Sequence, residues 1–340
     1  MGAIGVLTAG GDCPGLNAAI RGVVARATAV GKHVVGVEEG WQGLMGGTTR
    51  SLTRDDVRGI LGRGGTILGT SRIDPYVHGE GYESIRKTIE RLDIESVVVI
   101  GGDGSLRTAA QLHADGLPVI GIPKTIDNDI GHTDVSLGFH TAVQIVVDAI
   151  DRLTTTAESH NRVMVVEVMG RTAGWIALAA GMAGGAEAIL VPEVETDYDS
   201  LGARIRARHE QGHDYSIIVV AEGTPGSMGD VASSGVDSYG FSRIGGVCHS
   251  VAAELERITG FEARPVILGY LQRGGTPTAF DRILGTRFGV KAAELALQGS
   301  TGVMVALRGD EIATVDLMVA VAEPRALDPA RYEEASWFLV

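Results

Sequence analysis

Two aspartates in alternate positions, Asp127 and Asp129, are the strongest candidates for chemistry in this 340-residue chain. They belong to the run Pro-Lys-Thr-Ile-Asp-Asn-Asp at residues 123–129, beside Lys124 and the hydroxyl of Thr125. Alternate side chains of an extended backbone point the same way, so one carboxylate could accept a proton from a substrate hydroxyl while the other helps to hold a cation. Lys124 could offset the local negative charge. Asn and Asp are also common in turns, so these residues alone leave an ordinary strand-to-loop turn equally open.

The stretches before this run predict the elements that position it. Three apolar runs typical of buried strands each lead into a polar or glycine-rich loop: residues 4–8 before 10–17, 96–100 before 101–105, and 117–122 before 123–129. Strands that alternate with helices favour a parallel sheet, with ligands at the carboxyl ends of the strands. Glycine turns at a helix start suit phosphate, because free N–H groups and the helix dipole converge there. Asp103, a single carboxylate in such a loop, suits Mg²⁺, which takes few protein oxygens besides those of phosphate.

A second set of strand-like runs predicts another α/β lobe, entered through a helical pattern at residues 138–153. The runs are residues 163–168, 188–191, 216–221 and 265–268. Arg162, Arg171, Arg264 and Arg273 flank them, and in a chain of net charge −13 this set favours a phosphate pocket. Any one of these arginines, or Arg72 after the glycine-rich residues 64–69, could instead be an ordinary surface residue or ion-pair partner. Residues 224–242 predict a surface loop.

Composition restricts the class of protein. The 49 glycines are about twice the average share and follow apolar stretches without a repeat. A net charge of −13 argues against general binding to nucleic acid or to an anionic membrane. Cys13 and Cys248 support neither a disulfide framework nor a thiolate metal site, and no pair of the nine histidines has convincing metal-ligand spacing. Without a leader pattern or an apolar stretch of membrane-spanning length, we expect a soluble cytoplasmic protein.

These motifs, in this order, resemble those of the phosphofructokinase A family, the bacterial 6-phosphofructokinases. The resemblance covers nearly the whole length and is carried by residues 10–17, 101–105, 123–129, 168–171 and 272–275. It implies two similar three-layer α/β/α lobes with mostly parallel sheets and the active site in the cleft between them. Residues 1–138 with 274–305 are expected to form the ATP and Mg²⁺ lobe. Residues 139–273 with 306–340 are expected to form the fructose 6-phosphate lobe.

The resemblance also implies a reaction and a set of site residues. ATP would phosphorylate the 1-hydroxyl of fructose 6-phosphate in glycolysis, giving fructose 1,6-bisphosphate and ADP, with Asp127 as base and Thr125 and Arg171 as further catalytic residues. Asp103 would hold Mg²⁺, and the donor phosphates would lie against Gly11, Arg72, Gly102, Asp103, Gly104 and Ser105. The acceptor would contact Thr125, Ile126, Asp127, Met169, Gly170, Arg171, Glu222, Tyr270, Leu271 and Gln272, with Arg162, Arg264, Tyr270 and Arg273 on its 6-phosphate.

Two positions bear on the phosphoryl donor. In the family an aspartate at the position of Gly104 goes with pyrophosphate, so Gly104 leaves room for ATP, whereas Lys124 matches pyrophosphate enzymes. The combination of Gly104 with Lys124 resembles a branch of the family whose members use either donor. We expect ATP, because a side chain at position 104 would block it sterically, whereas an additional lysine can coexist with ATP. A pyrophosphate-dependent fructose 6-phosphate 1-phosphotransferase is the alternative, and an inactive sugar-phosphate sensor is a further one. Because the family supplies Arg162 and Arg264 from a neighbouring subunit, we expect a homotetramer or homodimer.

Overall fold

The chain divides into two compact units, each built from strands that alternate with helices. The computed structural model describes residues 2–77, 79–227, 229, 231, 233–236, 242–337 and 339. The first unit comprises Met1–Thr141 and Arg273–Arg325, and the second comprises Ala142–Gln272 and Ala326–Val340. The chain first passes from one unit to the other within helix α5, Phe139–His160.

The first unit contains a seven-stranded sheet among the described residues. In sheet order its strands are β13 (Glu311–Asp316), β12 (Val303–Arg308), β5 (Val119–Pro123), β4 (Ile94–Gly101), β1 (Ala3–Ala9), β2 (Val34–Val37) and β3 (Thr49–Ser51). The five inner strands are parallel, and β3 and β13 add antiparallel edges. Every residue of β1 and β5 is buried, which explains their continuous apolar runs.

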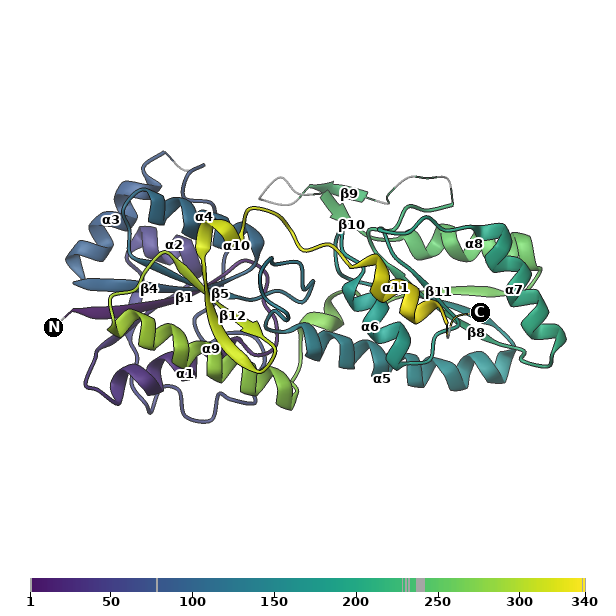
Figure 1. Ribbon diagram of the computed structural model, residues 1–340, viewed down its shortest axis with the longest axis horizontal. Helices are drawn as coiled ribbons and strands as arrows, with labels where there is room; N and C mark the ends of the chain where they lie inside the picture. The colour runs from purple at the N-terminus through teal and green to yellow at the C-terminus, as the bar shows by residue number, and fades with distance from the viewer. Residues whose placement is uncertain are drawn as a thin grey trace. The chain divides into compact units, whose positions relative to one another are not determined.

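Helices cover both faces of this sheet (Figure 1). Helices α1 (Leu16–Thr28) and α9 (Ala279–Leu297) pack together on one face, and α2 (Gly40–Gly46), α3 (Gly81–Arg91), α4 (Asp103–Ala114) and α10 (Leu317–Ala320) lie on the other. Glycines permit the close approach of α1 and α9, because a Cβ on Gly289 would lie 2.1 Å from the carbonyl oxygen of Ala19. The first unit is therefore a three-layer α/β/α unit, as predicted.

The second unit has a four-stranded parallel sheet in the part of the chain described. Its order is β11 (Ala263–Ile267), β6 (Val163–Val168), β8 (Ser216–Ala221) and β7 (Ala188–Leu190). Helices α7 (Tyr198–Glu210) and α8 (Val247–Thr259) cover one face, and α5, α6 (Trp175–Ala183) and α11 (Pro329–Ser336) cover the other. The 3₁₀ helix η1, Gly269–Arg273, follows β11. None of the described helices is long and apolar enough to cross a membrane.

The structure corrects two expectations about chain organisation. Residues 306–325 belong to the first unit and not to the second, because β12 continues through residue 306 and β13 pairs along its whole length with β12. Residues 224–242, expected to be a loop, contribute β9 (Ser233–Val236), which pairs antiparallel with β10 (Ser242–Ile244). Residues 228, 230, 232 and 237–241 of this stretch lie outside the described residues.

Candidate active site

The first loop of the candidate site runs from β1 into α1 and brings two guanidinium groups against its backbone. Gly10 and Gly15 have φ of 82° and 105°, so the turn uses left-handed conformations that favour glycine. A Cβ on Gly11 would lie 2.9 Å from Nη1 of Arg273 and 3.4 Å from Nη2 of Arg72. Glycine at position 11 therefore lets both arginines approach the loop, and their charge suits an anionic ligand.

The loop that carries Arg72 is tied to the first loop by backbone and side-chain hydrogen bonds. The Gly10 amide donates to the carbonyl of Ser71 at 3.0 Å, and Thr70 Oγ1 donates to the Gly10 carbonyl at 2.7 Å. The fully buried Asn17 accepts a hydrogen bond from the Ile67 amide at 2.8 Å. The sequence motif that contains Asn17 thus acts in part by fixing the neighbouring loop and not by touching a ligand.

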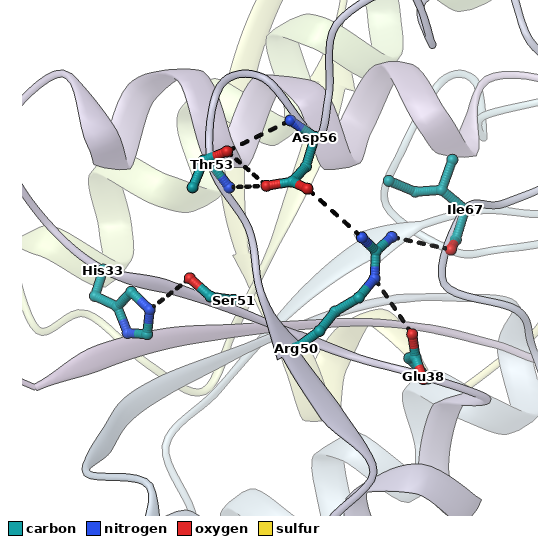
Figure 2. A network of polar contacts seen from close by, with 7 residues as sticks. All are labelled: His33, Glu38, Arg50, Ser51, Thr53, Asp56 and Ile67. Carbon is teal, nitrogen blue, oxygen red and sulfur yellow. Dashed lines mark hydrogen bonds and ion pairs between the residues drawn. The ribbon is translucent and has the colours of Figure 1, made fainter.

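Figure 2 shows a polar network around Arg50 that includes Ile67 of the same loop. Arg50 on β3 donates from Nη2 to the carbonyl of Ile67 at 3.3 Å. Its Nε lies 3.3 Å from Glu38, and its Nη1 lies 3.9 Å from Asp56. Asp56 in turn accepts hydrogen bonds from the amide and hydroxyl of Thr53. Nothing in the sequence marks Arg50 as a support for this loop, because its partners Ile67, Glu38 and Asp56 are brought to it by folding.

The second loop, between β4 and α4, presents a carboxylate on the first turn of a helix. Gly102 is the N-cap of α4, and Asp103 is its first residue. Arg107 Nε lies 3.0 Å from both carboxylate oxygens of Asp103, which is an i,i+4 ion pair on the helix surface. Ser105 is buried, and a Cβ on Gly101 would lie 2.5 Å from its Cβ. The glycines here allow the strand end, the helix start and Ser105 to pack closely.

The third loop holds the aspartates after β5. The backbone amide of Asp127 donates to Oγ1 of Thr125 at 3.1 Å. Asp127 is 5% exposed, and its Oδ1 is buried without a hydrogen-bond partner among the described residues. Asn128 has φ of 54°, and its side-chain oxygen accepts from the Ser136 amide at 2.9 Å, which fixes the turn. A buried carboxylate oxygen without a partner is costly, so its presence points to a ligand that supplies the missing donor.

Lys124 joins the first and third loops. Its Nζ donates to the carbonyl of Gly11, and the side chain is only 3% exposed. Burial lowers the pKa of Lys124 to about 8, although the nearby thiol of Cys13 and the carboxylates of Asp12 and Asp127 act in the opposite direction. The sequence predicted a lysine that offsets local charge, and the structure adds that it also holds the Gly11 backbone.

Arg273 belongs to the first unit. Its Nη1 donates to the carbonyl of Asp12 at 3.3 Å, beside Gly11. Its Nε is buried without a hydrogen-bond partner in the described part of the chain. The preceding residue, Gln272, is fully buried in the second unit, where its Oε1 accepts from the Met169 amide at 3.1 Å. The predicted Gln-Arg pair thus contributes one residue to each unit.

Three of the acceptor residues predicted in the second unit line one pocket of about 280 Å³, whereas Gly170, Arg171, Leu271 and Gln272 are not among its lining residues. Met169, Glu222 and Tyr270 line it, together with Glu167 and Gly246. The Arg171 amide donates to Oε1 of Glu222 at 2.9 Å, and Arg171 has φ of 54°. The pocket is smaller than the roughly 300–1,000 Å³ of sites for drug-sized ligands, which suits a single sugar ring.

Arg162 and Arg264 lie at the opposite end of the same sheet. Arg162 immediately precedes β6, and Arg264 pairs in register with Met164. Met169 and Glu222 follow the carboxyl ends of β6 and β8, so about 17 Å of strand separates the two groups. The structure therefore does not bring Arg162 and Arg264 to the pocket of their own chain.

A Mg²⁺ ion fits the donor set of the second loop. No cluster of three or more potential ligand residues occurs among the described residues. Mg²⁺ does not require one, because it is usually bound through one or two carboxylates with substrate phosphates and water. The side chain of Asp103 is 30% exposed, and its partner Arg107 is an exposed helix-surface residue. Such pairs are weak, so this carboxylate is accessible to a cation.

Sequence reasoning missed two buried carboxylates that organise the site's surroundings. Asp281 accepts hydrogen bonds from the Gly138 and Thr141 amides, each at 2.8 Å, at the start of α5. Glu167 accepts from the amides of Gly246 and Cys248 at the start of α8. The sequence did offer a signal for Glu167, because it is an acidic residue inside the apolar run at 163–168 and a charge in a buried strand needs partners.

Comparison with known proteins identifies the family. The family model described as Phosphofructokinase matches residues 3–296. ATP-dependent 6-phosphofructokinase 3 of Streptomyces coelicolor is 51% identical over 339 residues, covering 99% of both chains. Pyrophosphate–fructose 6-phosphate 1-phosphotransferase of Amycolatopsis methanolica is also 51% identical, over 338 residues, covering 98% of this chain and 99% of that one.

The fold points to the same family. The structure is similar to that of Pichia pastoris phosphofructokinase, with a TM-score of 0.83 and 32% sequence identity. The match covers 94% of this chain and 35% of the yeast chain, so this chain spans about a third of that protein's length. Sequence and fold agree that the chain belongs to the phosphofructokinase family.

Proposed function

We propose that this protein is a 6-phosphofructokinase that transfers the γ-phosphoryl group of ATP to the 1-hydroxyl of fructose 6-phosphate. The observation that carries the proposal is Asp127, whose Oδ1 is buried without a partner in the described chain. A substrate hydroxyl would donate to this oxygen and then transfer its proton there as the phosphoryl group arrives. The hydroxyl oxygen of Thr125 accepts a hydrogen bond from the Asp127 amide and so fixes the backbone of this base.

The first unit supplies the groups for the phosphoryl donor in this proposal. Phosphoryl transfer depends mainly on positioning and on charge stabilisation around the transferred oxygens. Gly11 lets Arg72 and Arg273 approach the loop backbone, and Gly102 places the start of α4 beside it. Asp103 would hold Mg²⁺, which when bound neutralises part of the charge on the donor phosphates.

The second unit supplies the acceptor pocket. Carboxylates accept hydrogen bonds from sugar hydroxyls, so Glu222 suits a hexose, and Met169 gives the ring an apolar contact. We assign Gly170, Arg171, Leu271 and Gln272 to acceptor binding as well, and we assign the same role to Thr125 and Ile126. Tyr270, which is 78% exposed, would offer a hydroxyl to the sugar phosphate.

The 6-phosphate site is proposed to need a second copy of the chain. Arg162 and Arg264 cannot serve the pocket of their own sheet, because they lie at the amino ends of its strands. The position of these two arginines at the strand ends is explained if they complete the 6-phosphate site of a neighbouring subunit. This arrangement supports a homodimer or a homotetramer as the working form.

ATP is the proposed donor because residue 104 is glycine. A side chain at this position, on the first turn of α4, would reduce the space for an adenine nucleotide's phosphates. Lys124 favours the alternative, a pyrophosphate-dependent enzyme, yet its Nζ is engaged by the Gly11 carbonyl. Relatives with either donor in their names are equally similar to this chain, so the choice rests on these two residues.

A glycolytic role in the cytoplasm follows from the proposed substrates. The described free thiols, Cys13 and Cys248, are both buried. Burial raises the pKa of the Cys13 thiol to about 12, so it stays protonated and unreactive. Free thiols suit a reducing compartment.

The decisive experiment is the initial rate of fructose 6-phosphate phosphorylation with Mg²⁺, comparing ATP and pyrophosphate at matched concentrations. A strong preference for ATP supports the proposal and makes the reaction effectively one-way. A preference for pyrophosphate would identify the protein instead as a pyrophosphate-dependent fructose 6-phosphate 1-phosphotransferase, whose reaction is reversible. Binding of fructose 6-phosphate without turnover by either donor would favour an inactive sugar-phosphate sensor.

A further inference from the structure

The pocket of the second unit contains a second carboxylate that the proposed chemistry does not use. Glu167 is the fifth residue of β6 and is only 3% exposed, yet it lines the pocket together with Glu222. An acidic side chain in the interior of a parallel sheet is costly unless donors surround it. Its position therefore requires an explanation beyond packing.

The partners of Glu167 are backbone amides at the start of α8. The Gly246 amide lies 2.8 Å from Oε1 and 2.9 Å from Oε2 of Glu167, and the Cys248 amide lies 3.0 Å from Oε2. Gly246 is the N-cap of this 13-residue helix and has φ of 97°. The N-terminus of a helix attracts anions, so Glu167 occupies a place that an external phosphate could otherwise take.

Glu167 also connects three of the four segments that line the pocket. Its backbone carbonyl accepts from the Leu268 amide at 3.2 Å, just before η1. Val168, the last residue of β6, and Met169, which follows it, also line the pocket, and the carboxylate of Glu167 accepts a hydrogen bond from Gly246 on another lining segment. Because Glu222 lies in the same pocket, the two carboxylates make the interior acidic. Such a site accepts hydrogen bonds from hydroxyl groups and disfavours a phosphate.

We propose that Glu167 is a specificity-determining residue, which blocks the N-terminus of α8 so that a sugar phosphate binds with its hydroxyl groups inside the pocket and its phosphate outside. The inference rests on the proposed function, because it concerns how the acceptor is oriented. An inverted acceptor would place its phosphate at α8 and would not present the correct hydroxyl for transfer. Glu167 acts through charge and through the position of Gly246, and not as a catalytic residue.

Substitution of Glu167 tests this assignment through inhibition by inorganic phosphate. Glu167→Gln keeps the size of the side chain and removes its charge, whereas Glu167→Ala also uncovers the α8 amides. With saturating donor, we expect inorganic phosphate to compete with fructose 6-phosphate about three-fold more tightly in the Gln variant and about ten-fold more tightly in the Ala variant, because anions are favoured at helix N-termini. KM for fructose 6-phosphate should rise in both, with kcat within about two-fold of wild type.

Glu187→Gln is the matched control. Glu187 is another buried glutamate of this unit, and it accepts from the Ile217 amide at 2.6 Å and from Arg208 at 2.7 Å. It immediately precedes β7 and does not line the pocket of Glu167. We expect Glu187→Gln to lower the stability of the fold without making inorganic phosphate a tighter inhibitor. The same result for both Glu167 variants would overturn the proposal and leave Glu167 a structural cap.

A measurement on the wild-type protein keeps the proposal testable if the variants do not fold. Fructose and inorganic phosphate, used together as inhibitors against fructose 6-phosphate, should bind at the same time, since one takes the pocket and the other lies outside it. Mutually exclusive inhibition would show that phosphate enters the pocket and would refute the assignment. If wild-type protein has no phosphofructokinase activity, the proposed function fails first. Activity with unchanged phosphate inhibition in the variants rejects only the role of Glu167.

Discussion

Arg162 donates from Nε to Oε2 of Glu262 at 2.6 Å, and the other oxygen of that carboxylate accepts from Arg264. The hydrogen bond from Arg162 lowers the pKa of the Glu262 carboxyl. Both arginines proposed to bind the 6-phosphate are thus held together by one acidic residue, far from the pocket of their own chain. Since each remains partly exposed, a phosphate from a neighbouring subunit's site could replace this carboxylate.

Shared sites predict complementation between two defective chains. Arg162→Ser and Glu222→Gln should each lower activity strongly when expressed alone. In a mixed dimer, one of the two sites combines the intact Glu222 of the Arg162→Ser chain with the intact Arg162 of the Glu222→Gln chain, and the other site has neither residue. Co-expression with random assembly should therefore restore about a quarter of wild-type activity. Activity no greater than that of the separate variants would show that each chain builds its own site.

Asp127→Asn should lower kcat by about 10²–10⁴-fold, the usual contribution of a general base, with little change in KM for fructose 6-phosphate. The amide keeps the size of the side chain and leaves the backbone bond to Thr125 in place. Steady-state kinetics and calorimetric binding of the sugar phosphate measure the two effects. Asp134→Asn, an exposed change in the same segment, should behave like wild type. Near-normal turnover of the Asp127 variant would remove this residue as the base.

Gly104→Asp should lower kcat/KM for ATP by about 100-fold or more, because a new carboxylate adds both bulk and charge repulsion beside the donor phosphates. Use of pyrophosphate should suffer less. The control is Gly79→Asp, where a Cβ would have no atom within 4 Å. Kinetics with each donor decide the matter, and unchanged ATP kinetics would contradict the steric argument.

Lys124 predicts a pH dependence of stability. Burial lowers its pKa from 10.5 to about 8, so between these values the unfolded chain binds more protons than the folded one. Below pH 8 the folded protein bears the full cost of a buried charge, and stability relative to Lys124→Met should increase as pH rises from about 8 to 10.5. Denaturant unfolding of both proteins at pH 7–10 measures this difference. Lys87→Met, on the exposed surface of α3, should show a smaller dependence, and a flat result for Lys124 would indicate that it is not buried as a cation.

The sequence determined the parallel core of each unit and the loops that follow its strands. Buried parallel strands read as continuous apolar runs, so β1, β4, β6 and β8 were predicted nearly to their ends. The glycine and aspartate motifs are contiguous, so a single sequence reveals them together with the residues at each strand end. The family follows from the same motifs, because their order along the chain is specific.

Only the tertiary structure decided which distant residues meet. The antiparallel edge strand β13 and the unit boundary near residue 325 depend on pairing between strands and not on a local pattern. Likewise, the contact of Lys124 with Gly11 joins positions 113 residues apart, and that of Glu167 with Gly246 joins positions 79 apart. Local periodicity carries no information about such partners, because the energy of a buried charge is set by the donors that folding brings to it.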